Sequence, residues 1–141
     1  MLTQVFVYVL TALAALVVVM TRLRLGRSTG AAGRLAVPRR LVDVHTAAGV
    51  VALVVWLVYV VAPDDTAAGG PGVGILALAA WWVVAGTGLL VLVRWLPSRG
   101  RHASAGAGDS WSDGPALSVL AHVGMLVGVV VFTWAYVRAV V

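Results

Sequence analysis

The chain has 141 residues, of which 62% are hydrophobic and only 11% are charged. Soluble domains carry about 25% charged residues, so these proportions exclude a soluble globular fold and predict a lipid environment. The net charge of +5 does not indicate nucleic-acid binding, because most arginines flank apolar segments. The absence of cysteine excludes disulfides, thiolate catalysis and cysteine-ligated metal centres.

The charged residues are of two kinds only. All 10 basic residues are arginine and all 5 acidic residues are aspartate. This usage is typical of a GC-rich genome, so the choice of arginine over lysine carries no functional meaning here. We expect a multi-pass protein of a bacterial cell membrane.

Four apolar segments are each close to the ~20 residues that a helix needs to cross a bilayer. The first covers residues 2–20. It has no basic residues before it and no convincing cleavage site after it, so we expect a retained helix and not a signal peptide. The others cover residues 41–62, 72–96 and 115–137, and the second and third are expected to stop at Pro63 and Pro97. The pattern predicts one all-α transmembrane domain over residues 1–141, an integral membrane four-helix bundle.

The connections between the spans predict an orientation. The second connection has no arginine and instead carries Asp64 and Asp65. The first and third carry nine arginines, namely Arg22, Arg24, Arg27, Arg34, Arg39 and Arg40, then Arg94, Arg99 and Arg101. The positive-inside rule therefore places both arginine-rich connections in the cytoplasm and both termini on the non-cytoplasmic side. Residues 98–114, rich in Gly, Ser and Ala, are expected to form a flexible cytoplasmic loop.

His45 and His122 are the two ionisable residues that lie within the predicted spans and away from their ends. Such residues are functional-site hypotheses by default. Because the second and fourth spans cross in the same direction, the two imidazoles are expected at a similar depth near the cytoplasmic face. Ala48 and Gly49 follow His45 at helical spacing and present a shallow surface, and Met125 follows His122 on an apolar stripe.

Four spans, a His-x-x-x-Gly motif at His45 and Gly49, and a second histidine on another span resemble the small four-helix membrane b-type cytochromes and the haem-bearing anchor subunits of respiratory enzymes. This resemblance implies one haem b between the second and fourth spans, used for electron transfer. The residues expected around it are His45 and His122 as axial ligands, Ala48 and Gly49 beside the ring, and Arg39, Arg40 and Arg94 on the propionate side. Di-haem members need four ligands, and the one remaining histidine, His102, falls in the predicted loop.

Other interpretations stay open. Histidines in spans also bond neighbouring helices, and Ala/Gly stripes pack helices in general. The chain would then be a non-catalytic accessory subunit of a larger membrane complex. A proton or metal path is a third interpretation, although two histidines lack the further ligands that zinc requires. A channel or transporter would need several copies of so short a chain.

Two glycine motifs are interpreted as helix-packing features, and the sequence shows no catalytic motif. Gly124 and Gly128 form a Gly-x-x-x-Gly turned away from His122, for packing against another helix or a second copy. Gly86, Thr87 and Gly88 mark a close helix crossing or a kink in the third span. Nucleophile–base pairs and phosphate-binding loops do not appear in the sequence, so we expect no enzyme activity of the chain on its own.

Overall fold

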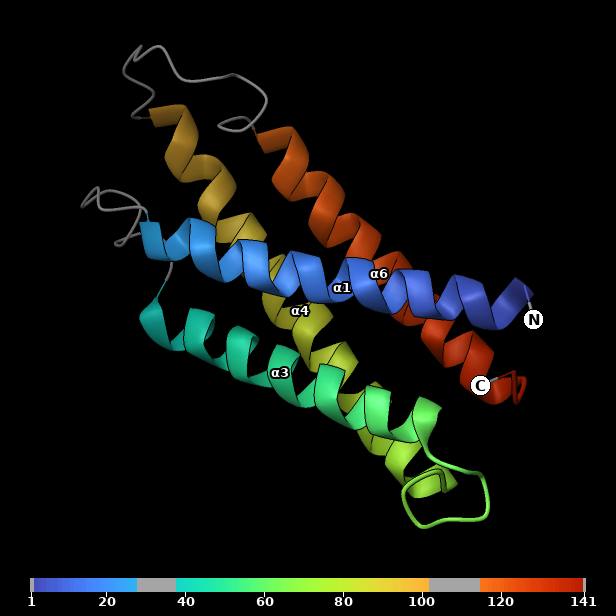
Figure 1. Cartoon of the computed structure of the whole chain (residues 1–141). Coiled ribbons are helices and arrows are strands. Elements are labelled where there is room, and N and C mark those ends of the chain that lie inside the picture. The colour runs from blue at the N-terminus through green and yellow to red at the C-terminus, as the bar shows by residue number, and fades with distance from the viewer. Residues whose placement is uncertain (1, 28–37, 102–114, 141) are drawn as a thin grey trace.

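The computed structural model describes residues 2–27, 38–101 and 115–140. They form four α-helices, α1 (Leu2–Arg27), α3 (Arg39–Val61), α4 (Pro71–Arg101) and α6 (Pro115–Val137) (Figure 1). Each contains a stretch that is long and apolar enough to cross a membrane. The all-α, four-helix fold is therefore confirmed, and by helix length and hydropathy the chain is a multi-pass membrane protein.

Two helices extend beyond the ends expected from the sequence. α1 continues past residue 20 to Arg27, and α4 passes through Pro97 to Arg101, so the expected stop at this proline is wrong. Both extensions lie outside the apolar stretches Leu2–Met20 and Pro71–Arg94. There, water can satisfy the carbonyl group that a proline leaves unpaired. Residues 102–114, which make up most of the expected cytoplasmic loop and include His102, lie outside the described residues.

The four helices form a closed ring of neighbours. α3 packs on α4, α4 on α6, α6 on α1, and α1 on α3. The helices α3 and α6 therefore lie diagonally across the bundle, and they run in the same direction, with both ends of the chain at one end of the molecule (Figure 1). Side chains from α3 and α6 can thus meet in the interior although their backbones are not neighbours.

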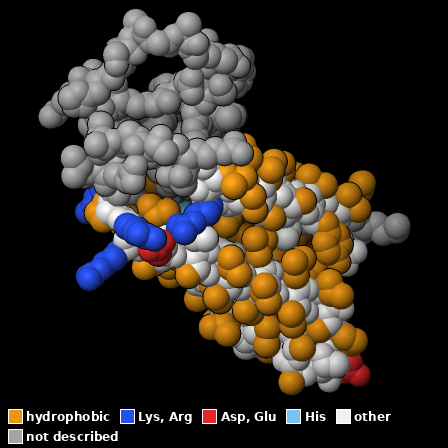
Figure 2. Space-filling view, turned by 60° about the vertical axis from the view of Figure 1, so that its left-hand side comes forward, with side chains coloured by type: hydrophobic (Ala, Val, Ile, Leu, Met, Phe, Trp, Pro, Cys, Tyr) orange, Lys and Arg blue, Asp and Glu red, His pale blue; other side chains and the backbone are white. Residues whose placement is uncertain are grey.

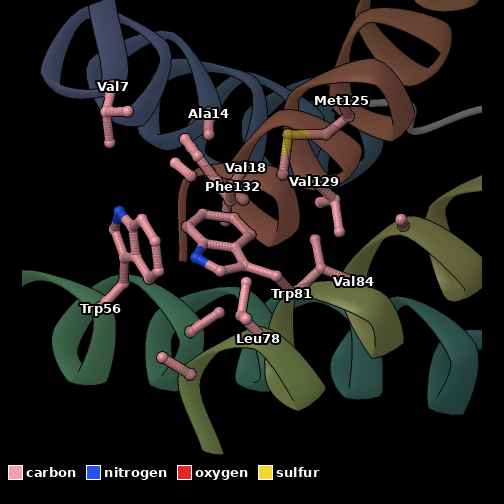
Figure 3. Close-up of a cluster of buried hydrophobic side chains, with 14 residues drawn as sticks. Val7, Ala14, Val18, Trp56, Leu78, Trp81, Val84, Met125, Val129 and Phe132 are labelled. Atoms are coloured by element: carbon pink, nitrogen blue, oxygen red, sulfur yellow. The ribbon is translucent and has the colours of Figure 1, made fainter. Parts of the chain in front are cut away.

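The bundle interior is filled by aromatic and small apolar side chains. Trp56, Trp81 and Phe132 are fully buried, with the Trp56 and Phe132 ring centres 4.8 Å apart and those of Trp81 and Phe132 5.6 Å apart (Figure 3). Valine and leucine side chains cover the outside, and Figure 2 shows this apolar surface between the two ends of the molecule. An apolar exterior around a packed interior suits a lipid solvent, where packing and interhelical hydrogen bonds hold helices together.

Close packing and one buried hydrogen bond join α1 to α3. A Cβ atom added to Gly49 would lie 2.8 Å from Val18 Cγ1, so only glycine allows this approach. The indole Nε1 of Trp56 donates to Thr11 Oγ1 at 3.0 Å, and the Thr11 hydroxyl donates in turn to the Val7 carbonyl at 2.8 Å. A polar pair inside the bundle thus adds a specific contact to the apolar packing.

The charged side chains lie towards the two ends of the bundle. Asp43 near the start of α3 pairs with Arg22 of α1 at 3.0 Å and more loosely with Arg39 Nε at 4.0 Å. The closest partner of Asp43 therefore comes from another helix and not from its own first turn. Because both members of the Arg22 pair are about half exposed, the contact contributes little to stability. Asp64 and Asp65 are exposed in the connection from α3 to α4, at the opposite end of α3 from Asp43.

Candidate functional site: a buried histidine pair

His45 and His122 meet in the interior of the bundle. Each lies about two turns from the start of its helix, α3 or α6. Their residues are 2% and 8% exposed, and the ring centres are 6.3 Å apart with 28° between the ring planes. Two helices on opposite corners of the bundle therefore bring two imidazoles together at one level.

The Nδ1 atom of His45 faces α4. It lies 3.1 Å from the Val84 carbonyl oxygen and 3.1 Å from Thr87 Oγ1. A carbonyl oxygen can only accept a hydrogen bond, so Nδ1 must be the protonated, donating nitrogen. In a neutral imidazole, Nε2 then carries the lone pair.

The Nδ1 atom of His122 is held within α6. It lies 2.7 Å from the carbonyl oxygen of Ser118, one turn earlier on the same helix. The same argument makes Nδ1 the donor and leaves the lone pair on Nε2. Both histidines therefore adopt the same tautomer, each fixed by a backbone carbonyl.

The two Nε2 atoms are buried without a hydrogen-bond partner among the described residues. Leaving a polar atom buried and unpaired costs about 1–3 kcal/mol, so two such atoms on facing rings call for an explanation. A metal-bound histidine almost always uses one nitrogen for the metal and donates the other N–H to a carbonyl or carboxylate. In both rings the Nδ1–H group already donates to a backbone carbonyl, as the outer N–H of a metal-bound histidine does.

The two imidazoles alone do not form a complete coordination shell for a free metal ion. Within residues 2–27, 38–101 and 115–140, His, Cys, Asp and Glu side chains do not gather in any group of three or more that could hold a metal ion. A free zinc ion takes four ligands, three or more of them from the protein. The pair of imidazoles instead matches what an iron porphyrin requires, since the macrocycle supplies the four in-plane nitrogens and the protein the axial positions.

Gly88 of α4 lies against both histidine rings. A Cβ atom at this position would be 3.0 Å from His122 Cδ2 and 3.1 Å from His45 Cε1. A Cβ added to Gly86, two residues earlier, would meet nothing within 4 Å. Of the two glycines around Thr87, Gly88 therefore makes the close crossing expected from the sequence, and the crossing is at the histidine pair.

The other residues expected near a cofactor have different surroundings. Gly49 is buried, but the space beside it is occupied by Val18 of α1; Ala48 is half-buried. Met125 is buried one turn after His122. The arginines expected on the propionate side are exposed at the end of the bundle that is nearer to the histidines, namely Arg39, Arg40 and Arg94. Contacts of these residues with a cofactor stay predictions.

A third side-chain nitrogen, on Trp81, is also buried without a hydrogen-bond partner among the described residues. This atom is the indole Nε1 of Trp81, one turn before Val84 on α4. Trp82, its neighbour, is exposed, and its Nε1 lies 3.3 Å from Thr133 Oγ1 of α6. Trp81 is thus a core residue, whereas Trp82 faces outward.

Sequence reasoning found both histidines but missed the residues that orient them. Val84, Thr87 and Gly88 all come from α4, a span without a histidine, and Ser118 contributes its carbonyl. The available signal was the Gly-Thr-Gly triplet, a polar residue between two small ones inside an apolar span. Its position on the third span gave no indication that it meets the histidines of the other two.

No family model, no curated protein and no solved structure matches this chain. The resemblance to small membrane b-type cytochromes therefore depends on the four spans and on the geometry of the histidine pair. These place the chain among four-helix membrane proteins, without assigning it to a family.

Proposed function

We propose that the chain is a membrane cytochrome that binds one b-type haem between α3 and α6, with His45 and His122 as axial ligands, and carries single electrons. The observation that supports this most is the pair of buried, unpaired Nε2 atoms on facing rings whose Nδ1 atoms are tied to backbone carbonyls. This is the arrangement that metal-ligating histidines adopt.

The ring-centre separation is compatible with one metal ion held between the two imidazoles. A metal–imidazole bond is about 2 Å and the ring centre lies about 1 Å beyond the nitrogen, so two imidazoles on one metal have centres roughly 6 Å apart. A direct N–H···N hydrogen bond of about 3 Å would bring the centres to roughly 5 Å. The observed separation is 6.3 Å. The observed separation is therefore close to the value for two imidazoles that share one metal ion.

The polypeptide would bind and orient the haem and shield it from water. His45 and His122 would hold the iron, Gly88 would keep α4 clear of both rings, and burial in the bundle would exclude water. The arginines at the nearer end of the bundle would pair with the propionates. When bound, haem supplies a one-electron iron couple whose potential depends on its axial ligands and their hydrogen bonds.

We also propose that both termini lie outside the cell and that the histidine pair is nearer to the cytoplasmic face. Arg22, Arg39, Arg40 and Arg94 lie at one end of the bundle, and Asp64 and Asp65 lie at the other. The positive-inside rule assigns the arginine end to the cytoplasm. A soluble redox protein on that side would be the nearer electron partner.

Haem titration of the purified protein tests the proposal. The wild-type chain should bind one haem per chain and develop a Soret band. The variants His45→Ala and His122→Ala should each lose this band, while His102→Ala, which removes the third histidine, should retain it. The proposal fails if the wild type gives no such band, or if the double variant His45→Ala/His122→Ala binds haem as well as the wild type does.

The accessory-subunit interpretation makes the opposite prediction. The histidines would then serve helix packing only, and the colourless protein would co-purify with other membrane subunits. Variants of His45 and His122 would still assemble with them. Haem titration and co-purification together therefore distinguish the two functions.

A further inference from the structure

We propose that Thr87 is a positioning residue for His45: its hydroxyl oxygen holds the imidazole proton on Nδ1 and so sets how strongly Nε2 donates to an iron. This inference rests on the proposed haem site. Thr87 itself would touch neither the haem nor the reacting electron, and would act only through His45.

The hydroxyl of Thr87 is oriented by its own helix. Thr87 Oγ1 donates to the Val83 carbonyl at 2.7 Å and lies 3.2 Å from the Val84 carbonyl. A hydroxyl has one hydrogen to donate and two lone pairs to offer. Because the hydrogen is used within α4, the oxygen presents a lone pair to His45 Nδ1, 3.1 Å away.

His45 Nδ1 thus has two acceptors, Thr87 Oγ1 and the Val84 carbonyl, and both belong to α4. His122 Nδ1 has one described acceptor, the carbonyl of Ser118 on its own helix. The two proposed ligands are therefore unequal. The orientation of His45 depends on how α3 and α4 are packed, whereas the bond of His122 belongs to a single helix.

Acceptors on the outer N–H of a metal-bound imidazole raise its basicity and fix its rotation, and removing such partners typically costs 10- to 100-fold in metal affinity or activity. A more basic imidazole stabilises the ferric state over the ferrous state. Loss of the Thr87 oxygen should therefore raise the midpoint potential of the haem and weaken its binding. A threonine with only a helix-packing role would affect neither.

The test compares three variants. Thr87→Val keeps the shape and removes the oxygen, and Thr87→Ser keeps the oxygen. Thr46→Val is a matched control, because the Thr46 hydroxyl lies next to His45 in sequence and bonds only to the Val42 carbonyl of its own helix. We expect Thr87→Val to raise the midpoint potential in spectroelectrochemical titration and to weaken haem binding about tenfold. Thr87→Ser and Thr46→Val should match the wild type. A Thr87→Val protein with wild-type potential and affinity would overturn the proposal.

A second measurement on the haem-free protein separates this inference from the haem proposal. Nitrogen-15 NMR of histidine-labelled protein reports which ring nitrogen carries the proton. We expect His45 to be protonated at Nδ1, with a proton signal that moves towards weaker hydrogen bonding in Thr87→Val but not in Thr46→Val. A His45 ring protonated at Nε2, or a signal unchanged by Thr87→Val, would refute the role of Thr87 whether or not haem binds.

Discussion

His45 and His122 present unpaired Nε2 atoms to the same interior, although their helices occupy opposite corners of the bundle. The Nδ1 bond of His45 reaches across to α4, whereas that of His122 stays within α6. The ring centres are 6.3 Å apart, and each Nδ1 atom donates to a backbone carbonyl, which leaves the lone pair of each neutral ring on Nε2.

Replacing Gly88 with valine should damage the histidine site selectively. A Cβ there would crowd both imidazoles, and overpacking costs about 1–3 kcal/mol, which corresponds to about a 5- to 150-fold loss of haem affinity. Gly86→Val, on the same helix where a Cβ meets nothing within 4 Å, is the control and should bind haem normally. Haem titration of both variants measures the difference, and equal affinities would show that Gly88 is not part of the site.

Replacing Gly49 with alanine should push α1 away from α3. The new Cβ would lie 2.8 Å from Val18 Cγ1, so we expect a loss of about 1–3 kcal/mol in the free energy of unfolding, measured by titration from mild detergent into SDS. Val18→Ala removes the clashing methyl groups and should restore part of this loss. Strictly additive effects in the double variant would contradict the contact, because coupled neighbours deviate by about 0.5 kcal/mol or more.

Thr11→Val should destabilise the bundle even though it preserves shape. The Trp56 indole N–H would remain buried without its acceptor, at a cost of about 1–3 kcal/mol in the free energy of unfolding. Thr11→Ser keeps the acceptor and should cost less, and Thr46→Val, which removes a hydroxyl bonded only within its own helix, serves as control. The same SDS titration ranks the three variants. The account of this hydrogen bond fails if Thr11→Val is as stable as Thr11→Ser.

The membrane orientation can be tested cleanly because the natural chain contains no cysteine. The variant Asp64→Cys, which has a single cysteine, should react with a membrane-impermeant maleimide in intact cells. A single cysteine at Arg40 should react only after the cells are opened. The reverse pattern would place the arginine-rich end, and the histidine pair with it, on the outer side.

The architecture was predictable from sequence because lipid imposes a simple rule. A span must be helical and about 20 residues long, so four apolar runs fix four helices. The buried face of α3 after His45 was also predictable, because Gly49, Ala52 and Trp56 recur at helical spacing and all are buried. The ends of the helices were less predictable. Beyond the apolar stretch, water can bond the carbonyl that a proline leaves unpaired, so α4 continues through Pro97.

The surroundings of the histidines could not be predicted for a different reason. Which helices become neighbours depends on the packing of many side chains at once, and helical periodicity within one span carries no information about its partners. Thr87 and Gly88 therefore had no visible link to His45 or His122. The contact between Gly49 and Val18 was hidden in the same way, and so was the pairing of Asp43 with Arg22.

The proposed function requires that one iron porphyrin binds between His45 and His122. Near-infrared magnetic circular dichroism of the haem-loaded, oxidised wild-type protein tests it most directly, because the energy of the low-spin charge-transfer band identifies the pair of axial ligands. We predict the band of bis-imidazole ligation, lost from both His45→Ala and His122→Ala and unchanged in His102→Ala. A band from any other ligand pair, or a bis-imidazole band that survives in either of the first two variants, would contradict the account.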